Sequence, residues 1–129
     1  MRITLALVGL SLLLAGCGGS SKPSVSPFAG TYSGTWSATP SGDTGTSSII
    51  VANSGSFTGT NTDTTQNTTG SFNGSITNSG AVTVTIQYTG GTTYSFTGSW
   101  TKTQSGIDGS VTGTVAGHSI NETFTFTEQ

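Results

Sequence analysis

The feature that most constrains the fold is a two-residue alternation of apolar and polar side chains that extends from Phe28 to Thr127. It is clearest over residues 81–88, where Val, Ile or Tyr stands at every second position and Thr or Gln stands between them. A period of two places the apolar side chains on one face of an extended strand. No stretch in this region carries a helical period, so the sequence predicts an all-β domain.

Eight segments show this pattern, and most are separated by short turns rich in Gly, Asn and Ser. Closely spaced strands of this kind are typical of antiparallel neighbours. The sequence therefore predicts an up-and-down meander of about eight strands that closes into a small β-barrel, with a β-sandwich as the alternative. The longest loop is expected at 61–69. Over 46–52 the pattern does not decide which side chains point inward, because Ile49, Ile50 and Val51 are consecutive. The predicted strands are 28–37, 46–52, 56–60, 70–77, 81–88, 93–101, 107–115 and 119–127.

Glycines recur beside the large apolar residues of these strands. A large apolar residue, any residue, Gly, and then Ser or Thr follow one another at Tyr32, Phe57, Phe72, Phe96 and Val111. All eleven aromatic residues fall on the predicted inner face. Glycines on that face allow the strands to bend and make room for a neighbouring ring over the backbone, as closure of a small barrel requires.

The N-terminal segment has the features of an export signal. Arg2 precedes an apolar stretch over 3–15, which is too short to span a bilayer as a helix and fits a signal peptide. The run Leu14-Ala15-Gly16-Cys17 resembles the lipobox of bacterial lipoproteins, and Cys17 is the only cysteine. The resemblance implies cleavage before Cys17 and attachment of a lipid to its sulfur. The alternative is an ordinary signal peptide cleaved near Ala15 or Gly16.

Three regions follow from this interpretation: a lipoprotein signal peptide at 1–16, a lipidated cysteine with a flexible linker at 17–27, and the barrel at 28–129. Acyl chains on Cys17 would hold the protein at a membrane of the bacterial cell envelope. Gly18 follows the cysteine. In the lipoprotein family an Asp at that position favours the inner membrane, so the resemblance implies the outer membrane of a two-membrane envelope.

The barrel pattern also resembles the lipocalins and the avidin-like proteins, which are small meander barrels. The local likeness is Gly34-Thr35-Trp36 in the first strand, since both families carry Gly-x-Trp there. Lipocalins pack an Arg over that Trp, and this chain has no Arg after Arg2. The residues with which avidins contact biotin have no counterpart either, so neither retinoid nor biotin binding is carried over.

Composition excludes several functions. Only 6% of the residues are charged, and without clustered Lys and Arg the chain is not expected to bind nucleic acid. One histidine, one cysteine and no phosphate-binding loop argue against an enzyme and against a bound cofactor.

Two sets of polar residues are candidates for a site. In a meander, the loops at 40–45, 61–69, 89–92 and 116–118 share one rim, at the end opposite the linker. This rim carries Asp43, Asp63 and His118, residue types that bind metal ions, although Asp is also a common turn residue and no metal is expected. Glu122 interrupts the apolar face of the last strand, where it would bind a ligand, line a wet cavity, pair with a Tyr hydroxyl or stand in water at the mouth.

Two functions remain as predictions. The first is a non-enzymatic envelope lipoprotein with a solid barrel that serves envelope structure or binds an envelope protein. The second is a lipocalin-like carrier of a small apolar ligand. A cavity of about 300 Å³ or more would favour the carrier. Its predicted lining is Tyr32, Trp36, Tyr94, Phe96, Trp100 and Glu122.

Overall fold

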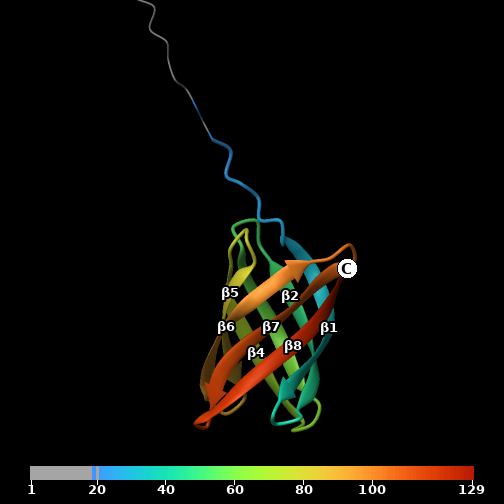
Figure 1. Cartoon of the computed structure of the whole chain (residues 1–129), viewed down its shortest axis with the longest axis vertical. Helices are drawn as coiled ribbons and strands as arrows, with labels where there is room; N and C mark the ends of the chain where they lie inside the picture. Colours follow the sequence, from blue (N-terminus) through green and yellow to red (C-terminus); the bar gives the residue numbers. More distant parts are fainter. Residues whose placement is uncertain (1–18, 20) are drawn as a thin grey trace, which may run out of the picture.

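The computed structural model of the chain describes residues 19 and 21–129, so the predicted signal peptide and Cys17 lie outside the described residues. The described chain forms eight strands in one closed barrel, ordered as in the sequence, and each strand is antiparallel to the next (Figure 1). This confirms the all-β meander barrel and rules out the sandwich. The strands are β1 (Gly30–Thr39), β2 (Thr44–Val51), β3 (Ser56–Asp63), β4 (Thr68–Ile76), β5 (Ala81–Tyr88), β6 (Thr93–Lys102), β7 (Gly106–Val115) and β8 (His118–Glu128).

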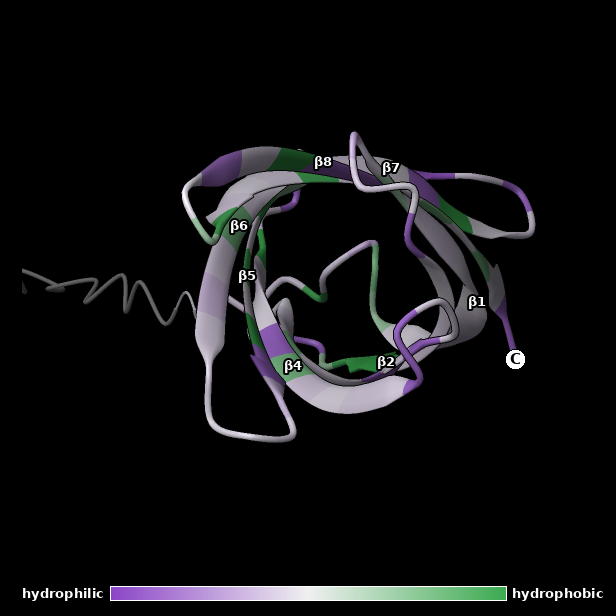
Figure 2. Cartoon of the chain, turned by 90° about the horizontal axis from the view of Figure 1, so that it is seen from below, coloured by the Kyte–Doolittle hydropathy of each residue, from purple (hydrophilic) through white to green (hydrophobic). Residues whose placement is uncertain are grey.

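The barrel closes where β8 pairs with β1, in a ladder that runs from Tyr32 opposite Glu128 to Thr39 opposite Asn121. Viewed along its axis, the chain forms a continuous ring of strands (Figure 2). The linker enters at the end we call proximal, and the turns after β1, β3, β5 and β7 lie at the opposite, distal end (Figure 1). The described residues include no helix long and apolar enough to cross a membrane.

The predicted loop at 61–69 is wrong. The strands β3 and β4 continue through Asp63 and from Thr68, which leaves only residues 64–67 as a turn. Asn61 and Asp63 point inward and are buried. Their polarity suggested a loop, but Asn61 finds a hydrogen-bond partner inside the barrel and Asp63 finds one in the β3–β4 turn, so the ladder does not have to end there.

Burial shows which side chains of the second strand point into the barrel. Ile49 and Val51 point into the barrel and are 0% and 3% exposed, whereas Ile50 lies on the outer surface and is 59% exposed. The strand also begins two residues earlier than predicted, which brings Gly45 into the ladder opposite Trp36.

Inward-facing glycines lie beneath aromatic rings, as predicted. Trp36 lies over Gly45, its cross-strand partner, so closely that a Cβ on Gly45 would be 2.5 Å from the indole. Between β3 and β4, Phe57 pairs with Gly74 and Gly59 pairs with Phe72, and each ring again occupies the space of the missing side chain. Rings and glycines thus fill the narrow interior together.

Packed aromatic rings fill the proximal half of the barrel. The ring centroids of Phe57 and Trp100 are 4.8 Å apart, those of Trp100 and Phe124 are 5.3 Å apart, and those of Phe124 and Phe126 are 4.8 Å apart. These side chains are all buried. Close-packed aromatic burial of this kind contributes strongly to the stability of a barrel core.

A polar cluster closes the proximal end. The Tyr32 hydroxyl is buried, donates to the Phe28 carbonyl oxygen at 2.8 Å and accepts from the Lys102 ammonium at 2.8 Å. The ammonium also forms an ion pair with Glu128 at 2.6 Å. Ser26, within the predicted linker, is buried here and donates its backbone N–H to the Asn53 carbonyl oxygen.

Candidate functional site

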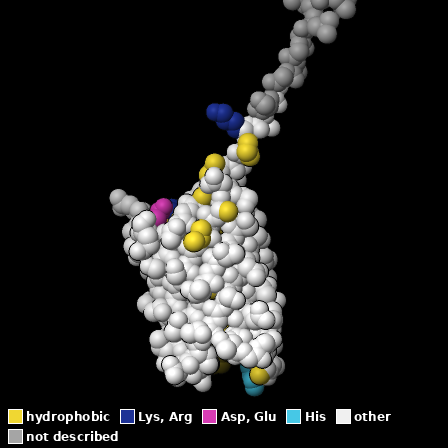
Figure 3. All heavy atoms as spheres, turned by 180° about the vertical axis from the view of Figure 1, so that it is seen from behind, with side chains coloured by type: hydrophobic (Ala, Val, Ile, Leu, Met, Phe, Trp, Pro, Cys, Tyr) yellow, Lys and Arg dark blue, Asp and Glu magenta, His cyan; other side chains and the backbone are white. Residues whose placement is uncertain are grey.

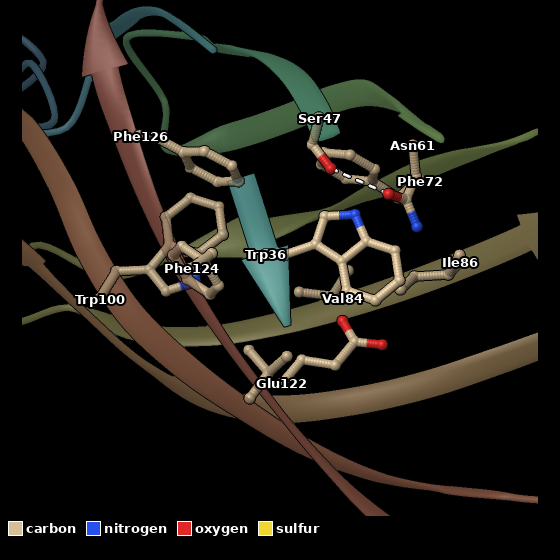
Figure 4. Close-up of a pocket in the computed structure, with 11 residues that line it drawn as sticks. Trp36, Ser47, Asn61, Phe72, Val84, Ile86, Trp100, Glu122, Phe124 and Phe126 are labelled. Carbon is tan, nitrogen blue, oxygen red and sulfur yellow. Dashed lines mark hydrogen bonds between the residues drawn. The ribbon is translucent and has the colours of Figure 1, made fainter. Parts of the chain in front are cut away.

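The distal half of the barrel holds an open cavity of about 410 Å³, which we call the distal cavity. A smaller inner pocket of about 40 Å³ lies deeper in the barrel, and Trp36 and Glu122 line both (Figure 4). Short side chains, among them Ala38 and Val115, face the distal cavity, whereas packed rings fill the proximal half. The distal cavity is lined by Trp36, Ala38, Asp43, Asp63, Tyr88, Tyr94, Phe96, Val115, Ile120 and Glu122, among others.

Three carboxylates from separate elements line the distal cavity. Asp43 comes from the β1–β2 turn, Asp63 ends β3, and Glu122 faces inward from β8. Burial raises the pKa of Glu122 to about 7, and the negative charges of Asp63 and then Asp43 add to the shift. Glu122 is therefore close to half ionised at neutral pH, whereas an exposed glutamate would be fully ionised.

Asp63 has a fixed position despite its burial. Its side chain is 5% exposed, and one carboxylate oxygen accepts the backbone N–H groups of Thr65 at 2.9 Å and Gln66 at 2.8 Å. The Gln66 side-chain amide donates to the Asp43 carboxylate at 3.1 Å. The β3–β4 turn thus holds two of the three carboxylates together.

Tyr88 lines the distal cavity, Asn61 lines the inner pocket, and the two side chains are hydrogen-bonded to each other. The Asn61 side-chain amide donates to the Tyr88 hydroxyl at 3.0 Å, and its carbonyl oxygen accepts from the Ser47 hydroxyl at 3.0 Å. Burial raises the pKa of Tyr88 above its ordinary value, and the charge of Glu122 adds to this effect. The Tyr88 phenol is consequently neutral throughout the physiological pH range.

The indole N–H groups of Trp36 and Trp100 are buried and have no hydrogen-bond acceptor among the described residues. Trp36 is 6% exposed, and Figure 4 shows its nitrogen turned toward Ser47 and Asn61, which line the inner pocket. A buried donor without a partner is costly and uncommon in folded proteins. The Trp36 donor therefore lies without a partner at the border of the inner pocket.

The structure brings most of the predicted site residues together. Trp36, Tyr94, Phe96 and Glu122 line the distal cavity with the rim residues Asp43 and Asp63, and Trp100 lines the inner pocket. Two residues lie elsewhere, since Tyr32 belongs to the proximal cluster and His118 is exposed on the rim without lining the cavity. Within the described part of the chain, no three metal-ligating side chains form a group.

Sequence reasoning missed Tyr88, Asn61 and Ser47 as site residues. A signal for Asn61 was present, because the alternation Phe57, Gly59, Asn61, Asp63 continues without a break. Extending the strand through these polar residues would have placed Asn61 and Asp63 on the inner face. Ser47 carried no comparable signal, because its role depends on the cross-strand register with Asn61.

Comparisons with protein-family models, curated proteins and solved structures find no match to this chain. The chemistry of the site is therefore deduced from its own residues. Aromatic and aliphatic walls with a few convergent polar groups are typical of small-molecule sites. Fold and site together define a small antiparallel barrel with a ligand-sized cavity at one end.

Proposed function

We propose that this protein is a lipid-anchored, non-enzymatic protein of the bacterial cell envelope whose barrel binds a small molecule in the distal cavity. The observation that supports ligand binding is the position of the cavity, about 410 Å³ in volume, in the mouth of the barrel between the aromatic side chains Trp36, Tyr94 and Phe96. Ligand sites occupy roughly 300–1,000 Å³, so the volume suits a small organic molecule. A barrel filled throughout would instead favour a role in envelope structure or protein interaction, and only the proximal half is filled in this way.

The proposed anchor is Cys17, acylated and attached at the outer membrane. The lipobox supports this part of the proposal, together with the entry of the linker at the proximal end. Each buried methylene contributes about 0.8 kcal/mol, so two or three acyl chains give lasting attachment. With the anchor on the proximal side, the mouth of the distal cavity faces away from the membrane.

Extraction of the purified protein tests ligand binding. The intact protein is isolated from its native membrane, extracted with organic solvent and examined by mass spectrometry for small molecules. In the variant Ala38→Phe the new ring fills the cavity, and we expect the extracted molecule to be lost. The control Ser37→Phe adds the same ring on the outer face of β1 and should retain it. Equal recovery from both variants would contradict ligand binding in the cavity.

Metabolic labelling with radioactive palmitate tests the anchor. We expect label in the native protein and none in Cys17→Ala, which should also leave the membrane fraction. Equal labelling of the two proteins would refute lipidation at this residue.

A further inference from the structure

We propose that the distal cavity selects small organic cations, with a ligand ammonium group held among Asp43, Asp63 and Glu122 and an apolar body held against the aromatic wall. This inference rests on the proposed ligand-binding function and specifies the chemical class of the ligand. Two independent properties of the cavity support it, its charge and its aromatic lining, and an unpartnered donor at the inner pocket adds a further requirement on the ligand.

The distal cavity is lined by acidic side chains. Three carboxylates line it, and no Lys or Arg among the described residues does. The Lys residues of the described chain lie elsewhere, Lys22 in the linker and Lys102 in the proximal cluster with Glu128. A concave site lined by one sign of charge between apolar walls concentrates its potential and attracts ligands of opposite charge. A ligand cation would supply the counter-charge that the surrounding residues do not.

The aromatic lining suits the same ligand. Trp36, Tyr88, Tyr94 and Phe96 line the cavity, and the rings of Tyr88 and Tyr94 meet edge to face with centroids 6.2 Å apart. The faces of such rings attract an ammonium group, most strongly where water is excluded. Carboxylates and aromatic faces that converge on one space therefore favour an amine over an anion or a neutral molecule of equal size.

The inner pocket adds a requirement at the other end of the ligand. The Trp36 indole N–H is buried, has no acceptor among the described residues and is turned toward this pocket (Figure 4). The pocket volume of about 40 Å³ suits a single small polar group. The ligand is thus expected to carry a hydrogen-bond acceptor, such as a hydroxyl oxygen, beyond its apolar body.

Binding of a cation should depend on pH through Glu122. The titratable groups that line the cavity with it are Asp43, Asp63, Tyr88 and Tyr94, whereas His118 is outside on the rim. Burial holds the pKa of Glu122 at about 7, and a bound cation would lower it. Affinity for a cation should therefore rise as Glu122 ionises through neutral pH.

The test uses three probes that share one phenol ring and differ in charge: tyramine, the neutral alcohol tyrosol and the anion 3-(4-hydroxyphenyl)propionate. Titration calorimetry is performed on the intact protein in a neutral detergent at pH 6 and pH 8. We expect tyramine to bind at least about tenfold more tightly than tyrosol, and the anion not to bind. Tyramine alone should gain affinity at pH 8, and the Trp36 indole N–H resonance should shift on binding.

Variants assign the preference to the cavity. Glu122→Gln removes a charge while keeping the shape, and should lower tyramine affinity at pH 8 severalfold and abolish its pH dependence. Asp108→Asn removes a carboxylate from the exposed outer face of β7 and should change neither. If tyrosol or the anion binds as tightly as tyramine and shifts Trp36, the cation inference is overturned while ligand binding stands. If no probe binds, the inference is also overturned, and the extraction experiment alone decides the proposed function.

Discussion

At the scale of single residues, Glu122 shows how the barrel tolerates a carboxylate on its inner face. Its side chain borders both the distal cavity and the inner pocket, so it is partly buried without being enclosed by apolar atoms. The folded protein holds the proton of Glu122 more tightly than the unfolded chain does, because burial disfavours the charge and Asp63 and Asp43 repel it.

This raised pKa makes stability depend on pH. The pKa of Glu122 is about 7 in the folded protein against an ordinary value of 4.5, so folding loses stability as pH rises from about 5 to 8. In Glu122→Gln this loss should disappear, leaving the variant more stable than the native protein at pH 8 by at most roughly 3 kcal/mol, and nearly equal at pH 4. Urea unfolding across this range measures the difference. If the free energies of unfolding of the two proteins changed with pH in parallel, the burial of the charge would be contradicted.

Gly45 is a second residue whose role is set by a single neighbour. A Cβ there would collide with the Trp36 indole and with the Thr62 carbonyl oxygen. We expect Gly45→Ala to destabilise the barrel by about 1–3 kcal/mol, because the ring must leave its place. Thermal unfolding monitored by tryptophan fluorescence measures this, with Gly19→Ala as a control, since a Cβ on Gly19 meets nothing within 4 Å. Equal unfolding temperatures for the two variants would refute the packing argument.

At the scale of strands and turns, alternation was sufficient to predict eight strands, their order and the inner faces of most of them, but it left the inner face of the second strand undecided. It failed at the end of β3, because Asn61 and Asp63 are polar residues made compatible with burial by Ser47, Tyr88 and the β3–β4 turn. Those partners come from other parts of the chain and are not visible locally. The cavity was equally hidden, since its volume depends on how far the proximal rings reach along the axis.

The β7–β8 turn holds an alanine in a backbone conformation that alanine disfavours, and a substitution can relieve this strain. Its two central residues are Ala116 and Gly117, with φ of 51° and 83°. Two-residue hairpin turns with both φ values positive favour Asn-Gly, and an L-residue other than Gly or Asn is strained there. We expect Ala116→Asn to stabilise the protein by about 1 kcal/mol and Ala116→Val to destabilise it. Chemical denaturation compares the two, and equal effects would contradict the assigned turn geometry.

At the scale of the whole molecule, the two ends of the barrel differ in packing and in charge. The proximal end is filled by rings and closed by the Tyr32–Lys102–Glu128 cluster, and the distal end is hollow and acidic. Between them the surface is mostly Ser, Thr, Gly and Asn, with few charged groups on the face in Figure 3, where the single histidine marks the distal end. An exposed sheet edge on so weakly charged a surface would invite aggregation.

The pairing of β1 with β8 leaves the sheet without an exposed edge, and hydrogen exchange can test whether the barrel is closed. Every strand has two hydrogen-bonded neighbours, and the β1–β8 ladder pairs Thr35 with Thr125 and Trp36 with Phe124 midway along its length. We therefore expect backbone amides at the centres of β1 and β8 to be protected as strongly as those of β4 and β5, because all open only with global unfolding. An open sheet would instead exchange rapidly along one side of each terminal strand. Rapid exchange confined to β1 and β8, with β4 and β5 still protected, would show that the barrel is not closed in solution.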